Sequence, residues 1–242
     1  DAIAEPDKKR YKEKAQITVS KKRTFEAASA YKDTKTAVHN FASASNPGGG
    51  VERGANAQEE CLCRCSGLFK CLNVPDTWSG FYMAHRAQHD PIHNDDIIYT
   101  PDVLVFKSDT VKPELMDEAD WYEVDVITCA APNLREKPSN AFNTGDGKDA
   151  IKITDKDLLA IHEKRLLRIL DVALSNKVET IVLGAFGCGA FMNNPNVVAL
   201  ASKNVVNEYL YAFKNIEFAV YCSPKDDTNY RIFDGVLKPY TK

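Results

Sequence analysis

Two glycine-rich segments, each lying between an apolar run and a segment of helical pattern, limit what this chain can fold into. The first, 46–50, follows the short strand-like run 37–41 and precedes a helical pattern that begins near Gln58. The second, 184–191, follows the apolar run 180–183 and precedes a helical pattern that begins at Pro195. Short β-rich runs that alternate with helical segments are typical of α/β domains, in which a sheet lies between layers of helices.

The rest of the chain fits one domain of this class. Its 242 residues can bury a complete hydrophobic core and lie at the upper end of single-domain lengths. The apolar pattern predicts further strands at 17–19, 97–99, 103–106, 124–129 and 217–222. It predicts helices that start at Thr24 and that cover 58–72, 75–88, 155–175 and 195–213. We also expect a turn at 100–102, a loop at 137–148 and a flexible or helical N-terminal segment over 1–16.

Charge and composition exclude several classes of protein. A formal net charge of -3 does not supply the broad positive field that nonspecific nucleic-acid binding needs. The best apolar run, 181–191, is shorter than the roughly 18 residues of a membrane helix, and the polar start does not resemble a secretory signal. Seven cysteines without a regular spacing indicate reduced thiols. We expect a cytoplasmic protein that binds neither nucleic acid nor membranes, and a monomer.

The first glycine-rich segment carries the strongest chemical signal. It reads Asn-Pro-Gly-Gly-Gly over 46–50, and Gln-Glu-Glu follows at 58–60 after seven residues. Consecutive glycines destabilise a fold, so they are kept where side chains would obstruct a ligand or where φ must be positive. Such a loop presents bare N–H groups that can hold phosphates or ribose hydroxyls. The two carboxylates lie at a predicted helix start, close to the ligand that this loop would hold.

The second segment is typical of an anion site. A strand, a glycine loop and a helix N-terminus place N–H groups at the carboxyl edge of a sheet. Its sequence over 184–191 is not the Gly-x-Gly-x-x-Gly of dinucleotide-binding proteins and lacks the Gly-Lys-Ser/Thr of nucleotide hydrolases. A superficial match to the latter at 145–148 follows no strand and is discounted.

Together these motifs resemble a known family. Three glycines, a spacer of six to eight residues and Gln-Glu-Glu are the hallmark of poly(ADP-ribose) glycohydrolases, whose catalytic domain is a macrodomain. The segments similar to the bacterial-type branch occur in the same order, at 40–50, 58–62, 99–103, 124–128, 131–133 and 187–191. The resemblance runs from about 17 to 233. It implies one macrodomain-like catalytic domain over 1–242, a three-layer α/β/α fold with a central mixed sheet.

The resemblance also implies roles for individual residues. Glu60 would be the catalytic acid, and Glu59 would hold the ribose next to the scissile bond. The second loop would wrap the diphosphate, and Phe191 would pack against the nucleotide. No metal and no cofactor is implied. The implied substrate-binding residues are Asn46, Gly48, Gly49, Gly50, Val51, Gln58, Gly187, Cys188, Gly189, Ala190 and Phe191.

The expected activity is removal of ADP-ribose from the ends of poly(ADP-ribose) chains. Cleavage of a ribosyl bond has an oxocarbenium-like transition state, so a carboxyl must protonate the leaving oxygen. Glu59 and the bound diphosphate would favour the protonated form of Glu60, whereas the helix N-terminus opposes it, so the net direction stays open. Two alternatives share the pocket: a mono(ADP-ribosyl) hydrolase and a non-catalytic ADP-ribose-binding macrodomain. The complete Gln-Glu-Glu argues against the second alternative, because a binding module needs no acid.

Two further clusters suggest a metal hydrolase as a third possibility. They are the cysteines and histidines at Cys61, Cys63, Cys65, Cys71, His85, His89 and His93. The cysteines contain no Cys-x-x-Cys pair, so we expect plain buried or surface thiols. Pro91 interrupts the helix before the last histidine, so we expect a solvated loop there. Tyr230 and Phe233, after the last predicted strand, are candidates for the adenine pocket, with packing as the alternative.

Overall fold

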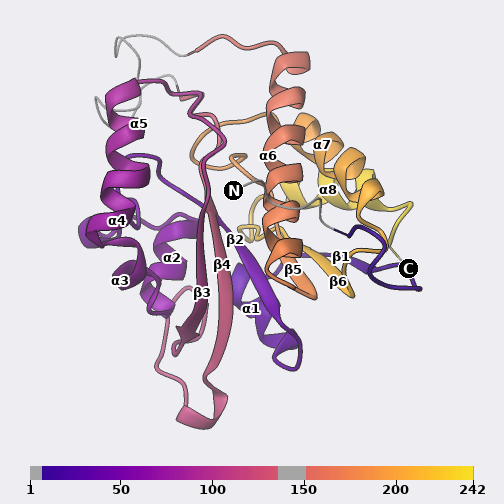
Figure 1. The fold of residues 1–242 in the computed structure, drawn as a ribbon, viewed down its shortest axis with the longest axis horizontal. Coiled ribbons are helices and arrows are strands. Elements are labelled where there is room, and N and C mark those ends of the chain that lie inside the picture. The colour runs from indigo at the N-terminus through magenta and orange to yellow at the C-terminus, as the bar shows by residue number, and fades with distance from the viewer. Residues whose placement is uncertain (1–6, 136–150, 242) are drawn as a thin grey trace.

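The fold is a six-stranded sheet between two groups of helices (Figure 1). It is seen in a computed structural model that describes residues 7–135 and 151–241. The strands occur in the order β1-β6-β5-β2-β4-β3, and all pair in parallel except β3, which is antiparallel to β4. Their bounds are β1 (Gln16–Ser20), β2 (Thr36–Phe41), β3 (Ile98–Val105), β4 (Tyr122–Cys129), β5 (Thr180–Leu183) and β6 (Asn215–Ala219).

The helices cover the two faces of this sheet. The N-terminal half supplies one group, namely α1 (Thr24–Ala28), α2 (Gln58–Cys65), α3 (Leu68–Leu72), α4 (Pro75–Thr77) and α5 (Met83–Gln88). The C-terminal half supplies α6 (Asp155–Ser175), α7 (Pro195–Glu208) and α8 (Thr228–Leu237). The predicted α/β/α arrangement with a mixed sheet is therefore confirmed. None of the described helices is both long and apolar enough to cross a membrane.

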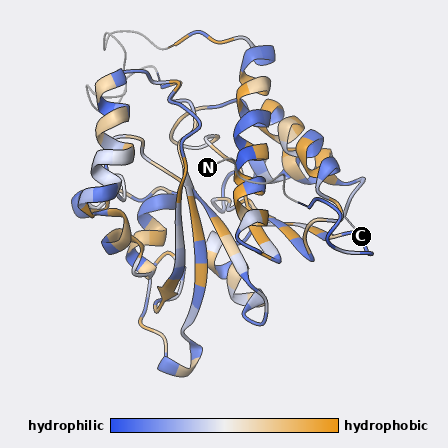
Figure 2. Cartoon of the chain, viewed as in Figure 1, coloured by the Kyte–Doolittle hydropathy of each residue, from blue (hydrophilic) through white to orange (hydrophobic). Residues whose placement is uncertain are grey.

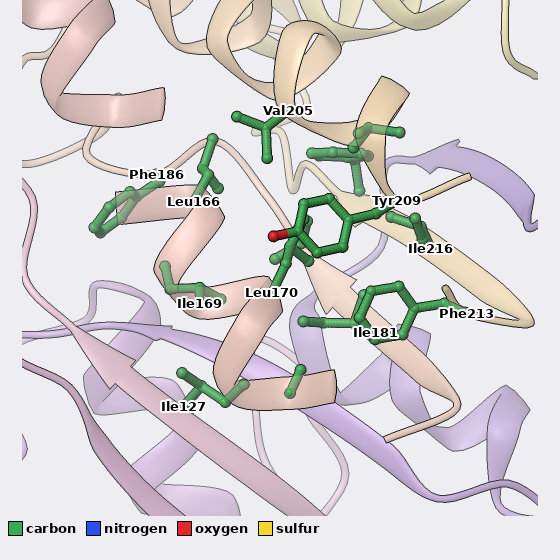
Figure 3. Close-up of a cluster of buried hydrophobic side chains, with 14 of the residues drawn as sticks. Ile127, Leu166, Ile169, Leu170, Ile181, Phe186, Val205, Tyr209, Phe213 and Ile216 are labelled. Atoms are coloured by element: carbon green, nitrogen blue, oxygen red, sulfur yellow. The ribbon is translucent and has the colours of Figure 1, made fainter. Parts of the chain in front are cut away.

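Each face of the sheet has its own hydrophobic core, because successive side chains of a strand point to opposite faces. On β4, Val126 belongs to the core beneath α1 to α3, and its neighbour Ile127 belongs to the core beneath α6 to α8. Val182 and Ile181 divide in the same way on β5. Apolar residues thus lie on both faces of the central strands, as expected for a sheet covered by helices. Figure 2 shows the hydrophobic residues along these strands. Figure 3 shows the larger core, where Leu170 of α6 lies over the sheet.

Several predicted elements are confirmed with the same bounds, and others are corrected. Helix 155–175 and strand 180–183 are as predicted. The predicted helix 58–72 is two helices, because Ser66 has an extended backbone (φ -146°) and forms an antiparallel bridge with Val105. The predicted turn at 100–102 is a bulge within the single strand β3, where Asp102 has φ +51°. The structure does not describe the predicted loop 137–148, which includes the discounted match at 145–148.

The C-terminal part differs more from the predictions. The helix predicted over 195–213 ends at Glu208. Residues 209–213 extend its apolar pattern, because Tyr209 and Phe213 pack into the core, but this segment is not helical. The last strand is Asn215–Ala219 rather than 217–222. Helix α8 was not predicted.

The segment before β1 is irregular where it is described. Residues 7–15 contain no helix. The Arg10 guanidinium donates hydrogen bonds to the carbonyls of Lys177 and Val178, and the Tyr11 and Ala15 N–H groups bond to the turn after α7. These bonds tie the segment to the turns that precede β5 and β6.

Arg165 of α6 fastens the loop before β3 to the end of β4. Its side chain is only 1% exposed and pairs with Asp95 at 3.2 Å. The guanidinium donates to the carbonyls of Ile92 and His93 and to the carbonyl of Ala130 at 3.0 Å. A buried guanidinium with these partners leaves several polar groups without bonds when it is removed.

Replacing this arginine tests its structural role. Arg165→Leu should lower the free energy of unfolding by about 3 kcal/mol, because buried carbonyls lose their donor and Asp95 loses one of its two cationic partners. Urea unfolding monitored by circular dichroism measures the change. Arg168→Leu, at an exposed position of the same helix, is the matched control and should change the free energy by less than about 0.5 kcal/mol. Equal effects in the two variants would contradict the assignment.

Candidate active site

A cleft of about 740 Å³ lies at the carboxyl ends of the parallel strands. Phe41 at the end of β2, Ala131 beyond β4, Ala185 beyond β5 and Val220 beyond β6 all line it. This is the edge at which open α/β sheets bind ligands, because the loops there are free to vary while the strands stay fixed. Both glycine-rich segments meet in this cleft.

The triple glycine lies directly against the two carboxylates. Gly48 and Gly49 have φ of +63° and +59°, a conformation that favours glycine. A Cβ on Gly49 would stand 2.5 Å from Glu60 Oε1 and 3.1 Å from Glu59 Oε2. Any side chain at this position would displace the catalytic candidates. Gly49 is therefore required by the close approach of backbone and carboxylates, whereas side chains at Gly48 and Gly50 would meet Phe69 and Ala55.

Glu60 is held in one orientation by two backbone donors. The Gly50 N–H donates to Oε1 and the Ala57 N–H to Oε2, each at 2.9 Å. Ala57 is the N-cap of α2 and Glu60 the third residue of that helix, so the carboxylate satisfies a helix-start donor while it lines the cleft. The side chain is 7% exposed. The result is a fixed carboxyl group at the cleft wall.

Glu59 occupies a different environment. It is 3% exposed, and it accepts hydrogen bonds from the Ser43 N–H at 2.7 Å and the Asn40 amide at 3.3 Å. Burial raises the pKa of Glu59 to about 8, and the charge of Glu60 adds to this, whereas the two donors act in the opposite direction. Glu59 therefore retains its proton over much of the neutral range, so it can donate a hydrogen bond to a ligand hydroxyl.

Gln58 fixes the start of the helix that carries both glutamates. Its amide donates to the His39 carbonyl at 2.8 Å and to the Thr24 hydroxyl, and its oxygen accepts from the Phe41 N–H at 2.9 Å. These bonds tie α2 to the end of β2. Gln58 lines the cleft, but its polar atoms are already bonded to the protein.

The second loop is shaped by Asn193, which is 2% exposed. Its amide donates to the carbonyls of Gly187, Phe191 and Pro132, and its oxygen lies 2.8 Å from His162 Nε2. Gly187 has φ +76°, and a Cβ there would stand 2.8 Å from the Asn193 amide nitrogen. The Cys188 N–H is bonded to the Ala185 carbonyl at 3.1 Å, whereas the N–H groups of Gly187, Gly189 and Ala190 have no hydrogen bond to a described residue and can face a ligand.

Most of the predicted site residues meet in the cleft. All of them line it except Gly48, Val51 and Cys188. Gly48 lies against Phe69, Val51 packs on the core beneath α1 to α3, and the Cys188 thiol bonds to the Phe186 carbonyl. These three belong to the support of the loops.

One end of the cleft was missed by the sequence analysis. The Arg23 guanidinium lies 4.0 Å from the ring centroid of Tyr221, 3.3 Å from Cys61 Sγ and 3.9 Å from Asp109. All four residues line the cleft. Arg23 follows β1 and Tyr221 follows β6, so the pairing of these strands brings the two side chains together. The signal in the sequence that could have indicated this end of the cleft is that Arg23 and Tyr221 each lie just beyond the end of a strand.

The two aromatic candidates for the adenine pocket do not reach it. Phe233 is fully buried in the core beneath α8, and Tyr230 packs against the same core, with Lys21 Nζ 4.8 Å from its ring centroid. Neither residue lines the cleft. Asn229, their neighbour on α8, does.

The expectation of a solvated loop at His93 is wrong, because this histidine is buried. His85 and His93 are buried with their ring centroids 5.9 Å apart, whereas His89 is exposed. Positive φ values at His89 and His93 turn the chain back after α5, and this places His93 beside the helix. Burial lowers the pKa of His93 to about 3.

The cysteines are free thiols, as predicted. Cys61, Cys63 and Cys65 are buried, and Cys71 is exposed. Within residues 7–135 and 151–241, no three His, Cys, Asp or Glu side chains are grouped so that they could hold a metal ion.

The raised pKa of Glu59 gives a testable pH dependence. Because the folded-state pKa of about 8 exceeds the ordinary 4.5, Glu59 makes the free energy of unfolding fall as the pH rises between these two values. Glu59→Gln should remove this part of the slope. Urea unfolding across this pH range measures it, with Glu123→Gln at an exposed position of β4 as the control. An unchanged slope in Glu59→Gln would contradict the assigned environment.

Comparisons with known proteins agree with this geometry. The family model described as "Microbial-type PARG, catalytic domain" matches residues 3–108. The structure of poly(ADP-ribose) glycohydrolase from Deinococcus radiodurans in complex with ADP-ribose is 30% identical, with a TM-score of 0.79, over 96% of this chain and 88% of that one. The Thermomonospora curvata enzyme bound to the inhibitor ADP-HPD is 31% identical, with a TM-score of 0.78, over 91% and 78%. No curated protein matches the chain. With this identity over nearly the whole fold, the chain belongs to the microbial-type poly(ADP-ribose) glycohydrolase family.

Proposed function

We propose that this protein is a poly(ADP-ribose) glycohydrolase that releases ADP-ribose from chain ends, with Glu60 as its general acid and base. The observation that carries the proposal is the fixed carboxylate of Glu60 at the cleft wall, bonded to Gly50 in the glycine loop and to Ala57 at the start of α2. Relatives with the same fold are glycohydrolases that bind ADP-ribose in crystals.

ADP-ribose suits the dimensions and chemistry of the cleft. A volume of about 740 Å³ is within the range of small-molecule sites. The diphosphate would bind to the N–H groups of 187–190, and Phe191 would pack against the nucleotide. The terminal ribose would then lie over Gly49, beside Glu59 and Glu60. The protonated carboxyl of Glu59 would donate to a hydroxyl of this ribose.

Cleavage would proceed through proton transfer at Glu60. The protonated carboxyl gives its proton to the glycosidic oxygen while the bond between that oxygen and the anomeric carbon breaks, which leaves an oxocarbenium-like centre. A water molecule then adds to this carbon and gives a proton back to the Glu60 carboxylate. The products are ADP-ribose and the shortened chain, and the enzyme returns to its initial protonation state. These steps use no group outside the chain other than water.

Two alternatives share this pocket. A mono(ADP-ribosyl) hydrolase would use the same residues on a different acceptor. A binding module would need the loops alone, so the two backbone donors that orient Glu60 favour an enzyme.

The seven free thiols suit a reducing compartment, so we propose a cytoplasmic location. A monomeric state stays a prediction.

Glu60→Gln tests the assignment of the acid. The variant should bind ADP-ribose like the wild type but lose roughly 10²–10⁴-fold in the rate of ADP-ribose release from poly(ADP-ribose), because it has no proton to transfer. Release is followed by chromatography, and binding by calorimetry. Glu52→Gln, an exposed neighbour outside the cleft lining, is the control. Unchanged turnover in Glu60→Gln would contradict the assignment of Glu60 as the acid. Inhibition of the wild type by a chelator would favour a metal hydrolase.

A pair of glycine variants tests the close approach of the loop. Gly49 and Gly54 both have positive φ, so alanine strains the backbone at each position. Only at Gly49 would the new Cβ meet the carboxylates, since no atom lies within 4 Å at Gly54. Gly49→Ala should therefore lose about 100-fold in kcat through misplacement of Glu60, whereas Gly54→Ala should stay near wild type. Equal losses would show that backbone strain alone is responsible.

A further inference from the structure

Three arginines line the cleft, and they differ in their surroundings. Arg23 is bonded to Cys61 and lies over Tyr221. Arg135 donates to the Ala190 carbonyl and lies over the Phe191 ring. The Arg53 guanidinium is exposed and has neither a hydrogen bond nor an ion pair with any described residue. An exposed, unpaired cation at the mouth of a cleft is available to bind an anion.

Arg53 is placed next to the proposed acid. It ends the short helical turn η2 (Val51–Arg53), which directly follows the triple glycine. Arg53 Nη2 lies 3.9 Å, and Glu60 Oε1 3.7 Å, from the point where a Cβ on Gly50 would stand. The two groups thus approach the same glycine without forming an ion pair.

The chemistry at Glu60 determines what would approach Arg53. The acid must contact the glycosidic oxygen, so the leaving group has to lie beside Glu60 and Gly50. In poly(ADP-ribose) this oxygen belongs to a ribose of the next ADP-ribose unit, which carries a diphosphate of its own. The diphosphate of the released unit would bind elsewhere, on the loop 187–190 that follows β5. A second anion is therefore expected on the side of the site that follows β2.

We propose that Arg53 binds the diphosphate of the leaving chain and so favours polymer over acceptors without phosphate. A planar guanidinium can donate two parallel hydrogen bonds to phosphate oxygens, which a neutral side chain cannot do. The inference rests on the proposed function, because the polymer defines the leaving group. Arg53 would act as a specificity-determining residue and would take no part in proton transfer.

Two substrates provide the test, and only one of them carries this diphosphate on its leaving group. One is the ADP-ribose dimer, and the other is the same compound truncated to an adenosine leaving group. Arg53→Gln should lower the ratio of kcat/KM for the dimer to that for the truncated compound roughly tenfold, since a charge-assisted bond is lost. Arg53→Lys should recover part of the ratio, and Arg168→Gln, outside the cleft, should leave it unchanged. Because the Arg53 side chain is exposed, its replacement removes no packing from the fold.

The outcomes separate this inference from the proposed function. An unchanged ratio in Arg53→Gln, or equal losses on both substrates, would overturn the role of Arg53 while the glycohydrolase activity stands. If the wild type cleaves neither compound, the proposed function fails. The ratio of dissociation constants for the two compounds, measured in a Glu60→Gln background with and without Arg53→Gln, requires no turnover. A tenfold change in that ratio would still support binding of the second diphosphate, and no change would exclude it.

Discussion

The hydrogen bond from the Gly50 N–H to Glu60 joins the two segments on which the whole site depends. It forms because Gly48 and Gly49 adopt positive φ and carry no side chain, so the loop can lie against the carboxylates at the start of α2. Gln58 ties that helix start to the end of β2, so the glycine loop, the helix and the sheet edge form one rigid unit. The close approach at Gly49 and the bonds of Gln58 explain why glycine and Gln-Glu-Glu occur together in this sequence.

Two adjacent glutamates acquire different properties from their surroundings. Glu59 is buried against the backbone of 43 and beside Asn40, and burial raises its pKa to about 8. Glu60 is oriented by two N–H groups and lines the cleft. In the proposed function, Glu59 would donate a hydrogen bond to the sugar, and Glu60 would transfer a proton to the leaving oxygen. Division of roles between neighbouring carboxyls by their environments is a general device of glycosidases.

The sequence predicted the parts of the molecule that local patterns determine. Helix α6 and strand β5 have the predicted bounds because a long amphipathic pattern and a short apolar run between polar residues are local signals. The break at Ser66 depends on its pairing with β3, which is distant in sequence. The Arg23 end of the cleft exists because β1 and β6 are neighbours in the sheet. Such contacts follow from strand order, which a single sequence does not specify. The burial of His93 beside His85 was not foreseen because it depends on positive φ values at His89 and His93 that turn the chain back after α5.

The position of a bound substrate relative to Glu60 would show directly whether this residue is the acid. A crystal structure of Glu60→Gln with the ADP-ribose dimer would show the uncleaved bond in the cleft. We expect the glycosidic oxygen to lie within roughly 2.6–3.2 Å of the substituted side chain, with the ribose over Gly49 and its diphosphate on the loop 187–190. A glycosidic oxygen placed next to Glu59 instead, or a ribose turned away from the triple glycine, would contradict it.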